Sequence, residues 1–146
     1  MNLEKLPNNY QQITLDTNIF VYYFGKHSKL HVLAEELFLY IVEKQIRIST
    51  SILSLTELLS LKTDEANIKK LEDGFTQIPN LTVLEVNREI ATLAAKIRRE
   101  YKFLLPDAIQ LATAAIAKAD IFITNDARLQ KFKEIKVVLL TKFAKK

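Results

Sequence analysis

Four acidic side chains occupy positions in this sequence where carboxylates could act together. They are Asp16, Glu57, Asp107 and Asp126. Asp16 and Asp126 come just after apolar runs typical of buried strands, whereas Glu57 and Asp107 lie in the first part of apolar helical segments. In an open parallel α/β sheet, both kinds of position converge on one rim. Carboxylates placed so near one another repel unless a cation lies between them. An all-oxygen ligand set favours Mg²⁺, with Mn²⁺ as a substitute.

Each acid also has a plainer interpretation when it is taken alone. Asp16 and Asp126 could cap the helices that follow them. Asp107 lies in the first turn of its helix, where the helix dipole stabilises an anion by roughly 0.3–1 kcal/mol. Glu57 could be an ordinary surface residue. It is the combination of all four acids at one expected rim that favours a site for chemistry.

The elements that would position these acids alternate between strand-like and helix-like patterns. We expect strands at 13–15, 46–50, 81–86, 120–124 and 137–140. We expect helices from 19 with Thr17 or Asn18 as cap, over 29–44, from Ser51 to 59, over 64–77, from 87 to about 100, over 106–118 and over 127–132. This alternation predicts an α/β fold with a five-stranded parallel sheet covered by helices on both faces. Residues 1–146 are expected to form a single domain with its core at about 12–140.

The composition excludes several classes of protein. Hydrophobic residues make up 49% and charged residues 26% of the 146 residues, which is ordinary for a globular domain. The absence of cysteine excludes disulfides, thiolate metal sites and a cysteine nucleophile. Only two glycines are present, so neither a dinucleotide fingerprint nor a phosphate-binding P-loop can be built.

Charge and hydropathy patterning suggest where the protein works and what it meets. No apolar run is long enough to span a membrane, and the first dozen residues lack a secretory signal. We therefore expect a cytoplasmic protein with no membrane association. The formal net charge of +4 is compatible with a nucleic-acid partner.

Four short motifs carry a resemblance to a known family. They are Asp-Thr-Asn at 16–18, Thr-Glu-Leu at 56–58, Pro-Asp-Ala-Ile-Gln-Leu-Ala-Thr-Ala at 106–114 and Thr-Asn-Asp at 124–126. From about 13 to 140 the chain resembles the PIN domain, and in size and motif spacing it resembles VapC-type toxins of bacterial toxin–antitoxin pairs. The resemblance implies a three-layer α/β/α fold, Mg²⁺-dependent endoribonuclease activity, a small cognate antitoxin and a homodimer.

The family's acidic positions fall on the same four residues of this sequence. The resemblance implies that Asp16, Asp107 and Asp126 hold the metal, directly or through water. Glu57 would complete the catalytic set by binding metal or helping to activate the water. Three polar residues beside the first and last acids would orient the carboxylates or water. These are Asn18, Thr124 and Asn125.

Basic residues near the expected rim are candidates for contacts with RNA phosphates. They are Lys26, Lys29, Arg128 and Lys131. Arg128 also marks a departure from the family, which often carries a further acid soon after its last motif. Here Ala127, Arg128 and Leu129 follow Asp126, so a fifth carboxylate ligand is not expected there.

Several other functions remain open at this stage. One is a PIN-type RNA-processing nuclease without an antitoxin, and another is a non-catalytic domain that holds a basic peptide in its acidic pocket. A phosphatase with Asp16 as nucleophile is less favoured, because such enzymes usually have a second Asp two residues on and this chain has Asn18. His27 and His31 are expected on the surface, because no other imidazole is present to complete a zinc site. The aromatic run at 22–24 is expected to pack rather than to stack on bases.

Overall fold

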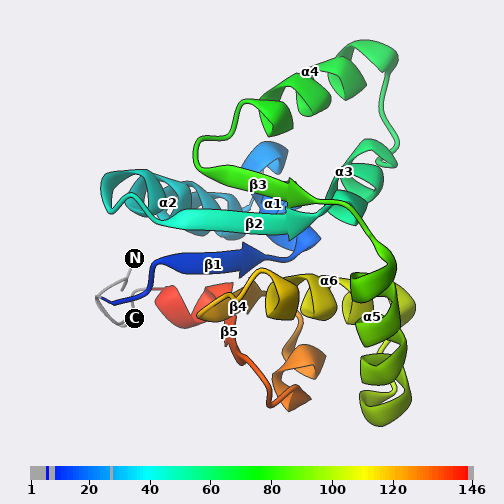
Figure 1. The fold of residues 1–146 in the computed structure, drawn as a ribbon. Coiled ribbons are helices and arrows are strands. Elements are labelled where there is room, and N and C mark those ends of the chain that lie inside the picture. Colours follow the sequence, from blue (N-terminus) through cyan, green and yellow to red (C-terminus); the bar gives the residue numbers. More distant parts are fainter. Residues whose placement is uncertain (1–5, 7–8, 27, 145–146) are drawn as a thin grey trace.

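The computed structural model describes residues 6, 9–26 and 28–144. They form three layers, a parallel sheet with helices on each of its faces (Figure 1). The strands are β1 (Gln12–Leu15), β2 (Arg47–Ser51), β3 (Leu81–Leu84), β4 (Ile121–Thr124) and β5 (Lys136–Leu139). They pair in parallel in the order β3-β2-β1-β4-β5. The predicted five-stranded parallel sheet is therefore confirmed, and its order places β1 beside β4, which is far away in the sequence.

Helices of two kinds connect the strands or follow the last of them. The α-helices are α1 (Thr17–Gly25), α2 (Lys29–Glu43), α3 (Ile52–Leu59), α4 (Glu65–Thr76), α5 (Arg88–Tyr101) and α6 (Leu105–Ile116). The 3₁₀ helices are η2 (Ala127–Lys131) and η3 (Leu140–Phe143). The helix expected over 127–132 is thus a 3₁₀ helix, a geometry that proteins use for short connecting pieces. The strand expected over 81–86 ends two residues earlier, at Leu84.

Apolar side chains fill both faces of the sheet, as β4 shows most plainly. Every residue of β4 is buried. Ile121 and Ile123 pack into a core with residues of α1 and α2, whereas Phe122 packs into a second core with residues of α5 and α6. Successive side chains of a strand point to opposite faces, so one apolar strand serves both cores. The expected cover of helices on both faces is confirmed.

Capping side chains account for where several helices begin. Ser51 and Asn87 cap α3 and α5, and each accepts a hydrogen bond from a backbone N–H of the first turn. The expectation that Thr17 or Asn18 caps the first helix is wrong. Asp16 is the cap of α1, because its carboxylate accepts the Thr17 N–H. Asp16 therefore has a structural role, and any chemical role must be judged from its surroundings.

The aromatic run of α1 is packed, as expected. Tyr22, Tyr23 and Phe24 pack against the core beneath α1 and α2. The rings of Tyr23 and Phe38 have centroids 4.5 Å apart. Within the described residues, no helix has the length and apolar character needed to cross a membrane.

Candidate active site

Asp16 lies at the carboxyl edge of the sheet, between two neighbouring strands. It follows β1, and its backbone N–H donates to the carbonyl of Ile123 in β4, at 2.9 Å. Its side chain is 7% exposed. One carboxylate oxygen, Oδ1, accepts the Thr17 N–H at 2.8 Å, and Oδ2 accepts the Thr124 hydroxyl at 2.7 Å. Strand order thus holds a buried carboxylate in one orientation.

The surroundings of Asp16 make its negative charge unfavourable. Burial raises the pKa of Asp16 from 3.8 to about 6, although hydrogen bonds from Thr124 and Thr17 partly offset this. The negative charges of Asp107 and Glu57 contribute a smaller part of this rise. Asp16 lies between β1 and α1, Asp107 in α6 and Glu57 in α3, yet the charges of Asp107 and Glu57 act on Asp16. The structure therefore brings them to one rim.

Asp107 and Asp126 lie on the more open side of this rim, joined by Arg128. Burial and then the charge of Asp126 raise the pKa of Asp107, while Arg128 lowers it. The pKa of Asp126 is lowered, mainly by hydrogen bonds from the Arg128 side chain. Arg128 Nε donates to the two oxygens of Asp126 at 2.9 and 3.1 Å, and Nη2 also contacts Oδ2. The same Nη2 lies 3.9 Å from Asp107 Oδ2.

Thr124 connects the two sides of the rim. Its hydroxyl donates to Asp16 and accepts the backbone N–H of Asp126 at 3.1 Å. It also accepts from Asn18 Nδ2 at 3.3 Å. The side chains of Thr124 and Asn18 therefore lie beside the acids, where the sequence predicts them. The described hydrogen bond of Asn125 is with the Tyr22 hydroxyl at 3.5 Å, so its predicted orienting role is not seen in its contacts.

A buried polar network beneath Glu57 was not anticipated from the sequence. The Thr17 hydroxyl donates to Glu57 Oε1 at 2.9 Å and accepts from Gln110 Nε2 at 3.2 Å. Gln110 also donates to Ser54 at 2.7 Å and accepts the Ser51 N–H at 3.3 Å. Gln110 is 1% exposed within the apolar helix α6. A glutamine on the buried face of an alanine-rich helix is the signal that could have revealed it.

The carboxylate cluster has the type of donor atoms that a divalent cation binds. Within the described residues, no three His, Cys, Asp or Glu side chains are arranged as a group that could hold a metal ion. The carboxylates are nevertheless hard oxygen donors of the type that Mg²⁺ prefers. Arg128 shows that positive charge is favoured between Asp107 and Asp126. Asn18 Oδ1 is buried and, among the described residues, has no hydrogen-bond partner.

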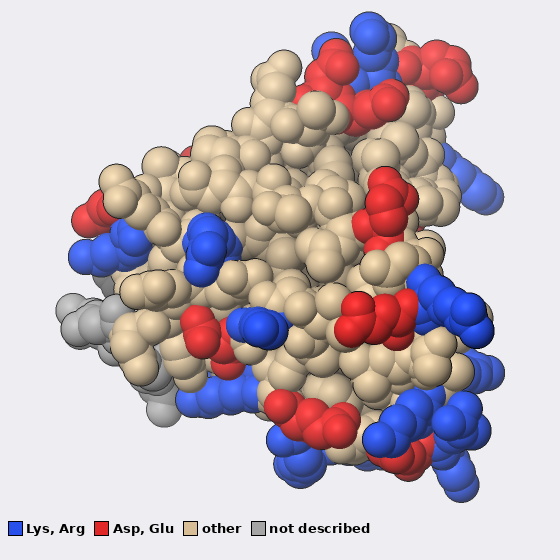
Figure 2. Space-filling view, in the orientation of Figure 1, with Lys and Arg blue, Asp and Glu red and all other residues tan. Residues whose placement is uncertain are grey.

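The candidate RNA contacts do not form one group. Arg128 lies on the acids, whereas Lys26 lines a groove that none of the four acids lines. Lys29 and Lys131 are exposed. On the face drawn in Figure 2, lysine and arginine side chains are spread out with acidic side chains among them. Contacts of these lysines with RNA remain predictions.

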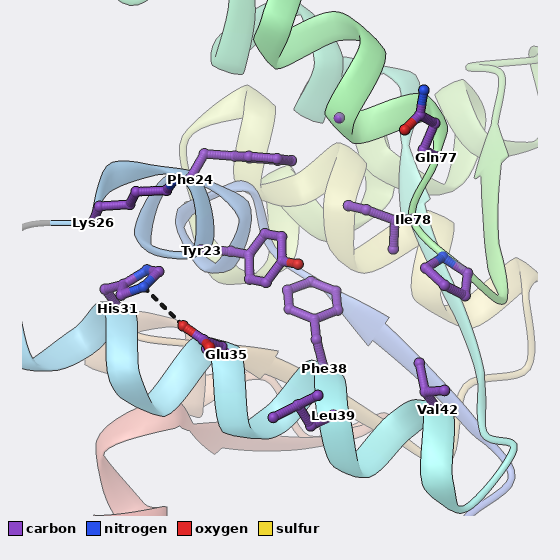
Figure 3. Close-up of a pocket in the computed structure, with 12 residues that line it drawn as sticks. Tyr23, Phe24, Lys26, His31, Glu35, Phe38, Leu39, Val42, Gln77 and Ile78 are labelled. Atoms are coloured by element: carbon purple, nitrogen blue, oxygen red, sulfur yellow. Dashed lines mark ion pairs between the residues drawn. The ribbon is translucent and has the colours of Figure 1, made fainter.

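An apolar groove, separate from the acidic rim, lies between α1, α2 and the segment that follows α4 (Figure 3). This groove has a volume of about 650 Å³, and its apolar wall includes Tyr23, Leu39 and Val42. His31 pairs with Glu35 at 3.0 Å at one end of it. The His31 side chain is 18% exposed at the edge of this groove, and His27 lies outside the described residues.

A parallel sheet in this order, with carboxylates gathered at its carboxyl edge, defines an α/β protein with an acidic, cation-attracting site. The profile of the PIN domain matches residues 13–135, most of the chain. The chain therefore belongs to the PIN domain family, and the resemblance inferred from its motifs is confirmed.

Solved structures share this fold. DNA-bound VapBC from Salmonella typhimurium contains a chain that matches with a TM-score of 0.70 and 19% identity, over 88% of this chain and 98% of that one. VapBC2 from Rickettsia felis, bound to a promoter fragment, gives 0.68 and 20% over the same shares of 88% and 98%. A toxin-antitoxin complex from Klebsiella pneumoniae gives 0.61 and 25% over 88% and 97%. A search of curated proteins found no match to this chain.

Proposed function

We propose that this PIN-domain protein is a Mg²⁺-dependent endoribonuclease and the toxin of a type II toxin–antitoxin system. The observation that carries the proposal is the gathering of carboxylates at one edge of the sheet. Glu57 and Asp107 raise the pKa of Asp16, and Asp126 raises that of Asp107. Such a cluster is strongly favoured only when a cation neutralises it. Membership of the PIN family and likeness to chains of VapBC complexes support the assignment.

Each acid would have a distinct task in cleaving a phosphodiester. Asp16, Asp107 and Asp126 would hold the ion. When bound, Mg²⁺ would screen the charge of the phosphodiester and lower the pKa of an attacking water. Asp16 is already oriented, because the Thr17 N–H and the Thr124 hydroxyl fix its two oxygens. Little rearrangement of this carboxylate would be needed.

Glu57 would handle the proton of the attacking water. Its Oε1 accepts the Thr17 hydroxyl, and Gln110 in turn donates to Thr17. This chain of hydrogen bonds fixes the carboxylate, so that Oε2 would accept a proton from water at the rim. Lys29 and Lys131, both exposed, would contact RNA phosphates.

Cleavage by the purified chain tests this function. Transfer, ribosomal and messenger RNA would be incubated with the protein in Mg²⁺ and in EDTA, and the new 5′ ends sequenced. We expect cleavage in Mg²⁺ alone and none by Asp16→Asn. Asp73→Asn, which changes an exposed acid on α4, is the matched control and should cleave normally.

Other results would assign another function. EDTA-insensitive cleavage, or full activity of Asp16→Asn, would overturn the metal-dependent mechanism. A phospho-aspartate trapped at Asp16 would identify a phosphatase. Failure to cleave any RNA, with binding of basic peptides, would identify a non-catalytic domain.

The apolar groove is the proposed seat of a small antitoxin. Leu39 and Val42 are 64% and 47% exposed at the groove, which is a large apolar exposure for helix α2. An amphipathic helix could bury both side chains. The solved relatives come from complexes named as toxin and antitoxin pairs, which supports a partner of this kind.

Co-expression with a small protein encoded directly upstream would test the antitoxin proposal. Leu39→Glu should abolish copurification, whereas Leu104→Glu, an exposed leucine outside this groove, should retain it. Absence of any such gene and partner would favour an RNA-processing nuclease without an antitoxin. The homodimer is likewise proposed from the family, and sedimentation of the purified chain would test it.

A further inference from the structure

The acidic rim already contains a positive charge that belongs to the protein. Arg128 follows Asp126 by two residues. Its guanidinium contacts both oxygens of Asp126 and reaches Asp107 Oδ2 at 3.9 Å. The two carboxylates expected to hold a metal ion are therefore joined by a side-chain cation.

We infer that Arg128 is a built-in counter-ion that competes with the divalent metal for Asp107 and Asp126. The inference rests on the proposed function, because it concerns the same metal site. Both Asp126 oxygens that would face a metal are bonded to the guanidinium. Two cations at one carboxylate pair repel, so the metal and the guanidinium are alternative occupants.

The local structure allows Arg128 to leave without disturbing the fold. Its side chain is 64% exposed. The backbone N–H of Arg128 separately donates to Asp126 Oδ1 at 3.0 Å. Through this bond the Asp126 side chain caps η2, so the turn does not depend on the guanidinium. The long side chain can swing into water while Asp126 keeps its place.

Competition explains two features of the rim together. Arg128 lowers the pKa of Asp126 and offsets part of the repulsion at Asp107, which favours the ionised form of both carboxylates. The same contacts occupy both carboxylate oxygens of Asp126, which a metal ion would also need. Metal loading requires an exchange of one cation for another.

Metal binding to charge variants tests this exchange without any RNA. Mn²⁺ would be titrated calorimetrically into the wild type, Arg128→Gln and Lys133→Gln. Lys133 is exposed and close in sequence, so its variant removes the same charge without touching the acids. We expect Arg128→Gln to bind Mn²⁺ at least about five-fold more tightly than the wild type, a usual size for coupling between ligands. Lys133→Gln should match the wild type.

A second measurement follows the guanidinium itself. The Nε–H resonance of Arg128, assigned by its loss in Arg128→Gln, should shift and exchange faster with water when Mg²⁺ is added. Tighter Mn²⁺ binding by Arg128→Gln together with this shift would establish the exchange.

Two results would overturn the inference, and they have different meanings. If Mn²⁺ binds the wild type and Arg128→Gln equally, or the Arg128 signal ignores bound Mg²⁺, competition is excluded while the metal site survives. If neither protein binds metal, the proposed function fails, and the inference falls with it.

Discussion

Asp16 and Asp126 are near-equivalent in the chain but opposite in their chemistry. Each follows one of two adjacent parallel strands, and each caps the helix that comes next. Burial raises the pKa of Asp16 to about 6, whereas Arg128 lowers the pKa of Asp126. The same position at the end of a strand thus produces a buried carboxylate without a cationic partner on one side of the rim, and a partly exposed carboxylate paired with Arg128 on the other.

The contrast shows that surroundings, not the motif, decide what each carboxylate can do. Thr124 and the Thr17 N–H fix Asp16, and no cationic group contributes to its pKa shift. The negative charge of Asp126 is paired with the Arg128 guanidinium, whose side chain is 64% exposed and can move into water. A metal ion would relieve the electrostatic strain at the first site and would have to displace a competitor at the second.

The largest effect is expected when the charge of either acid is removed. Asp16→Asn should lower RNA cleavage by more than about 100-fold, since even outer partners of metal ligands often contribute 10–100-fold. It should also stabilise the metal-free fold, because a pKa raised from 3.8 to about 6 costs roughly 3 kcal/mol at neutral pH. Asp126→Asn should lose comparable activity but gain no stability. Cleavage assays and urea unfolding of both variants would test this difference.

The second prediction concerns pH. Asp16 keeps its proton up to about pH 6 in the folded state and only to about pH 3.8 when unfolded. The stability that this proton provides is complete below pH 3.8 and is lost as the pH rises through 6. Metal-free protein should therefore become less stable across this window, and Asp107, whose pKa is also raised, adds to the loss. Urea unfolding at pH 4.5 to 7 should show a slope that Asp16→Asn largely removes; an unchanged slope would contradict the buried charge.

The buried side of the rim also depends on Gln110. Gln110→Leu keeps the volume but leaves the Ser51 N–H and the Thr17 and Ser54 hydroxyls without this partner. We expect a loss of about 2 kcal/mol in unfolding free energy, the usual penalty for stranded buried polar groups. Exposed Gln130→Leu on η2 is the matched control and should change stability little. Equal stability of the two variants would show that the network contributes nothing.

Much of the fold could be predicted because its signals are local. A few neighbouring residues are enough to predict these elements, as with the apolar residues of β4 and the helix caps Ser51 and Asn87. The type of η2 could not be predicted in this way, since a five-residue segment has too little periodicity to separate a 3₁₀ from an α-helix. Strand order, which brings β1 beside β4, follows from packing of the whole chain and not from either segment.

The site also has features that the sequence predicts and features that only the folded structure shows. Convergence of Asp16 and Asp107 could be predicted because parallel strands share one carboxyl edge. The contacts that tune them could not, since Thr124 meets Asp16 across 108 positions of sequence. The sequence predicts an RNA contact for Arg128, because it does not say whether a guanidinium meets phosphate, water or a nearby carboxylate. Only the folded surroundings show that Asp126 is within its reach.

The smallest expected effect lies at Thr124, the side chain that touches both acids. Thr124→Ser keeps the hydroxyl that donates to Asp16 and should change stability by about 1 kcal/mol or less, through the lost methyl group. Thr124→Val keeps the shape but removes that donor, so the pKa of Asp16 should rise above its present value. Mn²⁺ binding by the valine variant should then weaken at pH 6 and recover at pH 8, where the carboxylate is ionised. A serine variant that behaves like valine would mean that Thr124 supports the rim through packing, and that the hydroxyl does not set the difference between the two acids.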